Sequence, residues 1–217
     1  MRRRRTTVRI EPGDVLIAID VQNDFCPGGG LAVPRGDEVV PVINERAARF
    51  PHVMLTQDWH PSGHVSFASS HPGKSPFETI RLGYGEQVLW PDHCVSGTAG
   101  AAFHPGLDTH RAELILRKGF RPDVDSYSAL FENDRSTPTG LVGILRERGL
   151  RRLFLVGLAT DFCVQFSALD ALREGFEVYV LEDGVRGIDL RGSLAEAWRR
   201  MSESGVHRLG VGQLQFG

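Results

Sequence analysis

Short apolar runs recur along the chain and alternate with segments of helical pattern. Runs of β-forming residues lie at positions 15–19, 53–55, 114–116, 153–156 and 178–181, with a weaker run at 206–211. Unbroken runs of this kind are typical of strands that are buried on both faces of a parallel sheet. The segments between them predict helices at 37–49, 138–148, 162–174 and 194–203. This alternation predicts a three-layer α/β/α fold around a mainly parallel, doubly wound sheet of about six strands.

A long segment without a clear pattern interrupts this alternation. Residues 57–112 are rich in Pro, Gly, His and Ser and have only scattered apolar positions. Because a long irregular segment inside a compact domain usually carries function, we expect this one to contribute to a site. The 217 residues otherwise fit one domain, predicted to span residues 10–217 and to follow a disordered Arg-rich tail at 1–9.

Charge and hydropathy exclude several classes of protein. The chain holds 25 Lys and Arg against 27 Asp and Glu, and four of the basic residues form the run at positions 2–5. Without those four, 21 basic residues face 27 acidic ones, which argues against a nucleic-acid partner because such proteins need a basic surface. No apolar run approaches the length of a membrane span, so we expect a cytoplasmic protein with no membrane contact.

Reactive side chains follow the ends of four predicted strands. Asp20, Asp58 and Lys118 follow the first three, and the fourth leads through a turn to Cys163, one of an odd number of cysteines. The carboxyl ends of parallel strands meet at one edge of a sheet, where ligands bind. A thiol beside a carboxylate and an ammonium is typical of a nucleophile, and we expect the helix that begins near residue 160 to lower the pKa of Cys163. The alternative is that Cys163 is an ordinary core residue.

A second cluster predicts a metal site. Asp58 and His60 occupy alternate positions past a strand end and therefore point the same way, and His93 follows in the same long segment. One carboxylate and two imidazoles suit a divalent ion, with zinc the first choice and manganese and iron also compatible. The alternative is that these histidines are simply solvated on a loop.

Three aromatic residues lie beside these polar groups in the sequence. Phe25, Trp59 and Trp90 could each be ordinary packing residues. Together they could instead form a slot for a flat aromatic ligand.

These residues lie in five ordered motifs, and the set resembles that of the nicotinamidases, a branch of the isochorismatase-like cysteine hydrolases. The motifs are D-V-Q-N-D-F-C-P-G-G-G-L-A-V at 20–33, T-Q-D-W-H-P at 56–61, W-P-D-H-C-V at 90–95, K-G at 118–119 and V-G-L-A-T-D-F-C-V at 156–164. The resemblance implies hydrolysis of nicotinamide to nicotinate and ammonia in NAD salvage, with side activity on pyrazinamide, through a thioester acyl-enzyme. The sequence itself shows no interface, so a homo-oligomer is left open.

The resemblance also implies roles for individual residues. The catalytic triad matches Asp20, Lys118 and Cys163. The oxyanion hole matches the amides of Ala159 and Cys163, beside a cis peptide between residues 158 and 159. The metal, which holds the pyridine ring nitrogen in such enzymes, has its ligands at Asp58, His60 and His93. The residues that bind the substrate ring match Phe25, Leu31, Trp90 and Tyr127.

The chain also departs from the family pattern. Many relatives have His immediately before the nucleophile, where this chain has Phe162, so we expect a polar contact to be absent there. Some relatives have a fourth protein ligand to the metal, for which His64 and His71 are candidates here. The spacing to His64 resembles the three-ligand branch, so a supporting role behind the ligands is expected for it.

Other functions fit parts of the pattern. The nearest alternatives are another amide or carbamoyl hydrolase of the same superfamily and a hydrolase that acts on the vinyl ether of isochorismate. Two histidines and a carboxylate could also form an iron(II) oxygenase site, although that function would leave Asp20, Lys118 and Cys163 unused. A noncatalytic binding protein with the same fold is a further alternative.

Overall fold

A central sheet of six parallel strands organises the chain in the computed structural model, which describes residues 7–217. In chain order the strands are β2 (Asp14–Ile19), β3 (His52–Asp58), β6 (Leu114–Lys118), β7 (Arg152–Leu158), β8 (Glu177–Arg186) and β9 (His207–Leu209). They lie side by side in the order β6-β3-β2-β7-β8-β9, and every neighbouring pair is parallel. The predicted doubly wound sheet is confirmed, including its weak sixth strand.

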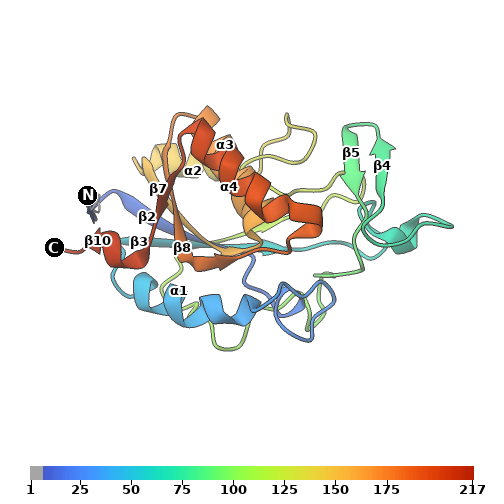
Figure 1. Ribbon diagram of the computed structural model, residues 1–217, viewed down its shortest axis with the longest axis horizontal. Helices are drawn as coiled ribbons and strands as arrows, with labels where there is room; N and C mark the ends of the chain where they lie inside the picture. The colour runs from blue at the N-terminus through green and yellow to red at the C-terminus, as the bar shows by residue number, and fades with distance from the viewer. Residues whose placement is uncertain (1–6) are drawn as a thin grey trace.

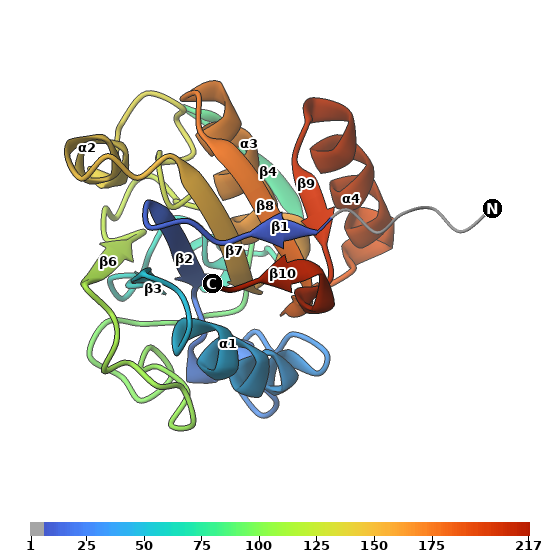
Figure 2. The ribbon, with the colours of Figure 1, turned by 90° about the vertical axis from the view of Figure 1, so that its left-hand side faces the viewer.

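Helices cover both faces of this sheet. The helix α1 (Val39–Ala47) lies on one face, and α2 (Leu141–Glu147), α3 (Gln165–Arg173) and α4 (Ser193–Ser204) lie on the other (Figures 1 and 2). The three predicted layers are therefore present. Within residues 7–217, no helix is both long enough and apolar enough to cross a membrane.

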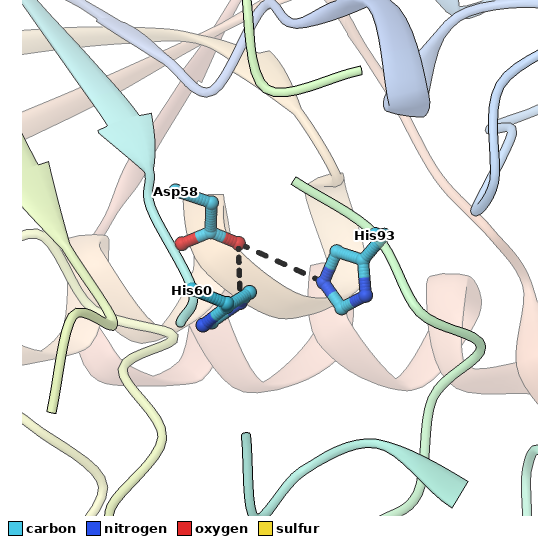
Figure 3. A group of neighbouring side chains, drawn as sticks. All are labelled: Asp58, His60 and His93. Atoms are coloured by element: carbon cyan, nitrogen blue, oxygen red, sulfur yellow. Dashed lines mark ion pairs between the residues drawn. The ribbon is translucent and has the colours of Figure 1, made fainter. Parts of the chain in front are cut away.

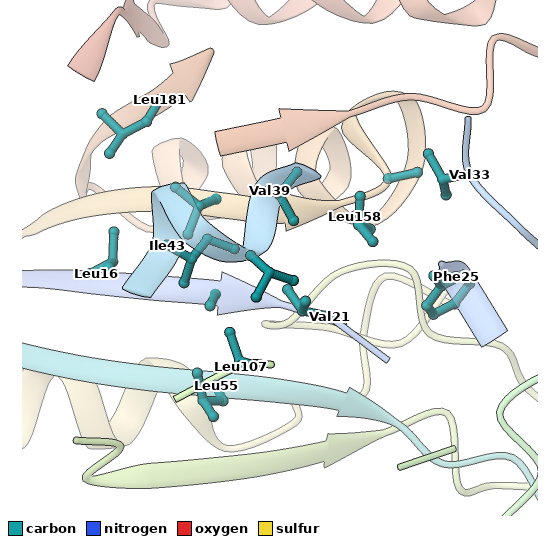
Figure 4. Packing of buried hydrophobic residues seen from close by; sticks show 14 of the residues in the cluster. Leu16, Val21, Phe25, Val33, Val39, Ile43, Leu55, Leu107, Leu158 and Leu181 are labelled. Atoms are coloured by element: carbon teal, nitrogen blue, oxygen red, sulfur yellow. The ribbon is translucent and has the colours of Figure 1, made fainter. Parts of the chain in front are cut away.

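The central strands carry apolar residues on both faces because alternate residues enter two different cores. Leu16 and Leu55 pack toward α1 with Ile43 (Figure 4), whereas Ile17 and Leu155 pack on the opposite face, toward the other helices. All six residues of β2 are buried, as expected for a strand at the centre of a parallel sheet.

The sheet reverses its winding direction between β2 and β7. Two strands follow β2 on one side, and the chain then returns to place β7 on the other side. Gly157 lets these strands approach closely, since a Cβ at this position would lie 2.1 Å from the carbonyl oxygen of Ile19. The crevice beyond the carboxyl ends of two such strands is the usual ligand site of an open α/β sheet.

Two features differ from the predicted elements. The segment 57–112 is not irregular throughout, because β4 (Thr79–Leu82) and β5 (Gly85–Val88) form an antiparallel hairpin that projects from one end of the molecule (Figure 1). Part of the expected tail is ordered, since β1 (Val8–Arg9) pairs with β10 (Leu214–Gln215). The rest of that tail, with the Arg run, lies outside the described residues.

Candidate active site

Asp20, Lys118 and Cys163 meet at the carboxyl edge of the sheet. The Lys118 ammonium lies 2.8 Å from a carboxylate oxygen of Asp20 and 3.5 Å from the Cys163 sulfur. Asp20, Asp58 and Cys163 each place a polar atom within 4.8 Å of the other two. Lys118 and Asp20 have no exposed surface, so their charges interact without screening by water. The structure therefore brings the three expected residues together.

Two further residues hold these groups in place. Thr56 Oγ1 donates a 2.6 Å hydrogen bond to Asp20 Oδ1, and the Asp20 amide donates to Thr56 Oγ1 in return. The Lys118 ammonium also donates to the carbonyl oxygen of Ser126 at 2.8 Å. Neither partner was expected from the sequence, because each pairing depends on the register of strands and loops that are distant along the chain.

The Thr56 contact leads to a first prediction. Thr56→Val keeps the shape of the side chain but removes the donor that orients the Asp20 carboxylate, so we expect kcat to fall about tenfold, the equivalent of one lost charged hydrogen bond. Thr56→Ser keeps the hydroxyl and should stay within about threefold of wild type by the same argument. Steady-state ammonia release from the two variants tests this, and equal rates for Thr56→Val and wild type would contradict it.

Burial dominates the electrostatics of the triad. It raises the pKa of Asp20 to about 6, although the neighbouring Lys118 ammonium opposes that shift. Burial would lower the pKa of Lys118, but the carboxylates of Asp20 and Asp58 outweigh it and raise that pKa well above its usual value.

The predicted fall in the pKa of Cys163 was wrong. Burial raises the pKa of the thiol well above its usual value, and Lys118 only partly offsets this effect. Cys163 lies in a π-helical turn at Thr160–Val164, before α3 begins at Gln165. The thiol is therefore protonated at rest and needs a base to attack a substrate.

The turn that carries Cys163 has the backbone expected from the family resemblance. The peptide bond between Leu158 and Ala159 is cis. Ala159 is extended and leads directly into the turn at Thr160. Two amides are expected to form an oxyanion hole. That of Ala159 immediately precedes the turn, and that of Cys163 lies within it.

Asp58, His60 and His93 form a compact cluster beside the triad (Figure 3). Asp58 Oδ2 lies 3.5 Å from His60 Nε2 and 3.9 Å from His93 Nε2. In each ring the other nitrogen donates to a carbonyl oxygen at 2.8 Å, that of Gly119 for His60 and that of Pro91 for His93. These bonds leave the Nε2 atom of each ring facing the Asp58 carboxylate, and metal-binding histidines are oriented by the same kind of hydrogen bond from the other ring nitrogen.

The charges of this cluster favour binding of a cation. Burial would raise the pKa of Asp58, but Lys118 and His60 outweigh it and hold that pKa well below its usual value, so the group is a carboxylate. Burial lowers the pKa of His93 to about 4, and its neighbour His60 adds to the effect. A neutral His93 and an ionised Asp58 are the protonation states that metal ligands require. Burial would lower the pKa of His60, but the Asp58 carboxylate outweighs it and raises that pKa, so His60 gives up a proton when a cation binds.

Gln22 and Asp24 fix the backbone around the cluster. The Gln22 amide group bonds to Asp58 twice, as Nε2 donates to its carbonyl oxygen and Oε1 accepts from its N–H, both at 2.8 Å. Asp24 Oδ2 accepts the N–H of Cys94 at 2.7 Å, next to His93. Both residues belong to the first sequence motif, but their partners could not be read from it.

His64 lies beside the cluster but has no free nitrogen. Its ring stacks on that of His60 with centroids 4.3 Å apart. Its Nδ1 lies 2.7 Å from the Ser66 hydroxyl, and its Nε2 lies 2.9 Å from the carbonyl oxygen of Arg121. His71 is engaged elsewhere, with Nε2 2.7 Å from the carbonyl oxygen of Val65. This geometry favours the expected three-ligand arrangement.

A second prediction follows for His64. His64→Asn removes the stacked ring but none of the three proposed ligands, so we expect the variant to keep the metal content per chain of wild type while its thermal stability falls. Metal analysis of the purified protein together with a melting curve measures both quantities. A loss of metal that exceeds the loss of folded protein would identify His64 as a ligand.

A narrow pocket opens between the triad and the metal-type cluster. Its lining consists of Phe25, Leu31, Asp58, Trp90, His93, Asp125, Tyr127, Ala159, Phe162, Cys163 and Ile188. The four residues expected to bind a substrate ring are all among them. Trp90 donates from Nε1 to the Tyr127 hydroxyl at 3.0 Å, and Phe162 stands edge-on to Trp90 with centroids 4.8 Å apart.

The pocket also differs from the expectation in two respects. Trp59 does not line it, and the Arg117 guanidinium lies over the Trp59 ring, 3.8 Å from its centroid. Asp125 and Ile188 do line it, although neither was expected from the sequence. A weak indication for Asp125 was present in the sequence, because its carboxylate stands two residues before Tyr127, a residue already expected to bind the substrate ring. No such indication was present for Ile188.

Comparisons with known proteins find similar proteins over most of the chain. The isochorismatase domain model matches residues 14–211. A nicotinamidase of Acinetobacter baylyi is 54% identical over 194 residues, which cover 89% of this chain and 91% of that protein.

Solved structures give the same result. The Acinetobacter baumanii nicotinamidase and pyrazinamidase is 55% identical, covers 92% of this chain and 97% of its own, and superposes with a TM-score of 0.91. The pyrazinamidase of Pyrococcus horikoshii in complex with zinc is 37% identical, covers 92% of this chain and 99% of its own, and superposes with a TM-score of 0.74.

Proposed function

The chain belongs to the isochorismatase family, in its nicotinamidase branch, and is a hydrolase; from that premise we propose that it hydrolyses nicotinamide to nicotinate and ammonia, and pyrazinamide likewise, with Cys163 as the nucleophile. The observation that carries the proposal is the meeting of two groups at one pocket. Cys163 lines the pocket with Asp20 and Lys118 buried behind it, and Asp58 and His93 of the second cluster line the same pocket. A flat aromatic amide fits between the aromatic walls.

The first step is attack by sulfur on the carboxamide carbon. Asp20 takes the thiol proton of Cys163 as the S–C bond forms, which a carboxyl group with its pKa raised to about 6 does more readily than an ordinary aspartate. Lys118 contacts both partners and stabilises the negative charge as it moves from one to the other. The carbonyl oxygen becomes an oxyanion, for which the amides of Ala159 and Cys163 are the proposed donors.

The second half of the reaction reverses these proton transfers. Asp20 returns its proton to the nitrogen as the C–N bond breaks, so ammonia leaves and a thioester remains on Cys163. Water then attacks the thioester carbon and gives its proton to Asp20. Nicotinate is released as the thiol takes the proton back. One carboxyl group thus serves as base, acid and base in turn.

The donor set of the second cluster fits a divalent cation. Asp58, His60 and His93 would hold it through one oxygen and two nitrogens whose orientation the Gly119 and Pro91 carbonyls already fix. When bound, such a cation supplies a Lewis acid for the ring nitrogen of the substrate. Zinc suits this set best, and manganese and iron share its ligand preferences.

A substrate panel tests the proposal. Nicotinamide, pyrazinamide, isochorismate and N-carbamoyl amines are incubated separately with the metal-loaded protein, and ammonia and the organic product are measured together. We expect equal amounts of ammonia and carboxylate from the first two and none from the others. Turnover of isochorismate or of the carbamoyl compounds in preference to nicotinamide would contradict it.

A further inference from the structure

The segment from the end of β8 to the first residue of α4, residues 187–193, contributes to the wall of the pocket through Ile188. Its backbone is unusual for residues with a side chain. Asp189 and Arg191 have φ values of 58° and 54°, in the left-handed region that L residues rarely adopt. Such conformations persist only where surrounding contacts hold them.

Asp161 supplies those contacts. Its carboxylate is buried and accepts the N–H of Ile188 at 3.0 Å and the N–H of Asp189 at 2.8 Å. The hydroxyl of Ser193 donates to the same carboxylate, so the three donors span the segment from end to end. Gly187 packs against this group, since a Cβ there would lie 3.1 Å from Asp161 Oδ1.

Asp161 also belongs to the turn that carries the nucleophile. It stands two residues after Ala159 and two before Cys163, in the π-helical turn at the end of β7. One short turn therefore holds both the reactive sulfur and the carboxylate that fixes the opposite wall. A change in the position of the segment changes the distance between Ile188 and a ring held next to Cys163.

We propose that Asp161 is a positioning residue that fixes residues 187–193, and that Ile188, held in this way, determines which ring substituents the pocket admits. The specificity part rests on the proposed function, because it takes the ligand to be a pyridine carboxamide. Ile188 excludes rings that carry an alkyl group on the side that it contacts. Asp161 has no contact with the substrate and acts through Ile188.

The specificity part is tested with nicotinamides that carry one methyl group at each free ring carbon in turn. In Ile188→Ala we expect kcat/KM for at least one isomer, relative to nicotinamide, to rise about tenfold, the gain that one accommodated methyl group supplies. Leu172→Ala is the matched control. Leu172 is also a half-buried aliphatic residue, but it lies in α3, packs against the core and does not line the pocket. Unchanged ratios for every isomer would overturn this assignment.

The positioning part is tested by hydrogen exchange. Asp161→Asn keeps one acceptor but turns an NH₂ group toward the other donors, so we expect the amides of Ile188 and Asp189 to exchange at least about tenfold faster. Ser193→Ala removes one donor and should give a smaller change in the same direction. Asp14→Asn alters a buried carboxylate at the start of β2, at the edge of the sheet away from the pocket, and should leave the exchange rates of these two amides unchanged. Wild-type exchange rates in both Asp161→Asn and Ser193→Ala would contradict the proposal.

A double variant separates positioning from a general loss of structure. If Asp161 acts through Ile188, Asp161→Asn alone raises KM for nicotinamide about tenfold, with a smaller change in kcat. When Ile188→Ala is already present, adding Asp161→Asn raises KM by less than about twofold. Additive KM effects would overturn the proposed route. The exchange experiment does not depend on turnover. If the wild type proves inactive on nicotinamide, the proposed function is contradicted, but the exchange rates still test whether Asp161 fixes the segment.

Discussion

Replacing Cys163 with alanine should lower kcat/KM for nicotinamide by about 10⁴-fold or more, because the variant keeps the pocket and loses the only group that forms the covalent intermediate. Asp20 and Lys118 remain paired at 2.8 Å in the absence of the sulfur, so the fold and the metal content should not change. Ammonia release, a melting curve and metal analysis on the same preparation measure the three quantities.

The other two cysteines provide the control for this experiment. Cys26 and Cys94 are buried and free like Cys163, but neither lines the pocket. Cys26→Ala should therefore keep kcat/KM within about threefold of wild type, as expected for a substitution away from the reacting atoms. Undiminished ammonia release by Cys163→Ala, or an equal loss in Cys26→Ala, would remove Cys163 from its proposed role.

The second large effect is expected from loss of Asp58. Asp58 supplies the oxygen toward which both His60 and His93 direct Nε2, and it also contacts the Lys118 ammonium at 2.5 Å. Asp58→Ala should lower the bound divalent metal to near zero and kcat/KM by at least about 100-fold, which is the loss seen when metal sites are weakened. Metal analysis and ammonia release measure both effects.

Chelation separates the two roles of Asp58. Removal of the metal from wild type leaves the contact between Asp58 and Lys118 in place, so activity should disappear on chelation and return when zinc is added back. Asp58→Ala should not recover under the same treatment. Full activity in chelated, metal-free wild type would show that the cluster does not serve catalysis, and wild-type metal content in Asp58→Ala would exclude it as a ligand.

The parallel sheet and its strands could be predicted because burial on both faces leaves a simple signal. Every residue of β2 is buried, so its run of apolar residues is unbroken, and the same holds for most of β7. The strand ends then point to Asp20, Lys118 and Cys163 without further information. The hairpin β4–β5 gave no such signal, since its residues are mostly exposed or half-buried and lack an apolar run.

Contacts between distant segments could not be predicted in the same way. The bond from Thr56 to Asp20 depends on the register of β2 against β3, and the place of Ile188 depends on three hydrogen bonds to Asp161. The pKa of Cys163 was predicted in the wrong direction because local sequence shows the helix start but not the burial of the thiol. Burial is a property of the assembled core, to which Cys163 contributes.

The central claim is that the Cys163 sulfur attacks the carbonyl carbon of a pyridine ring compound held in this pocket, and nicotinaldehyde labelled with ¹³C at its carbonyl carbon tests it most directly. An aldehyde has no leaving group, so attack stops at a thiohemiacetal, whose carbon resonance differs from those of the free aldehyde and its hydrate. We expect this resonance with wild type and with Cys26→Ala, and its absence with Cys163→Ala. Wild-type protein that shows only the aldehyde and hydrate resonances, or a Cys163→Ala variant that still forms the adduct, would contradict the claim.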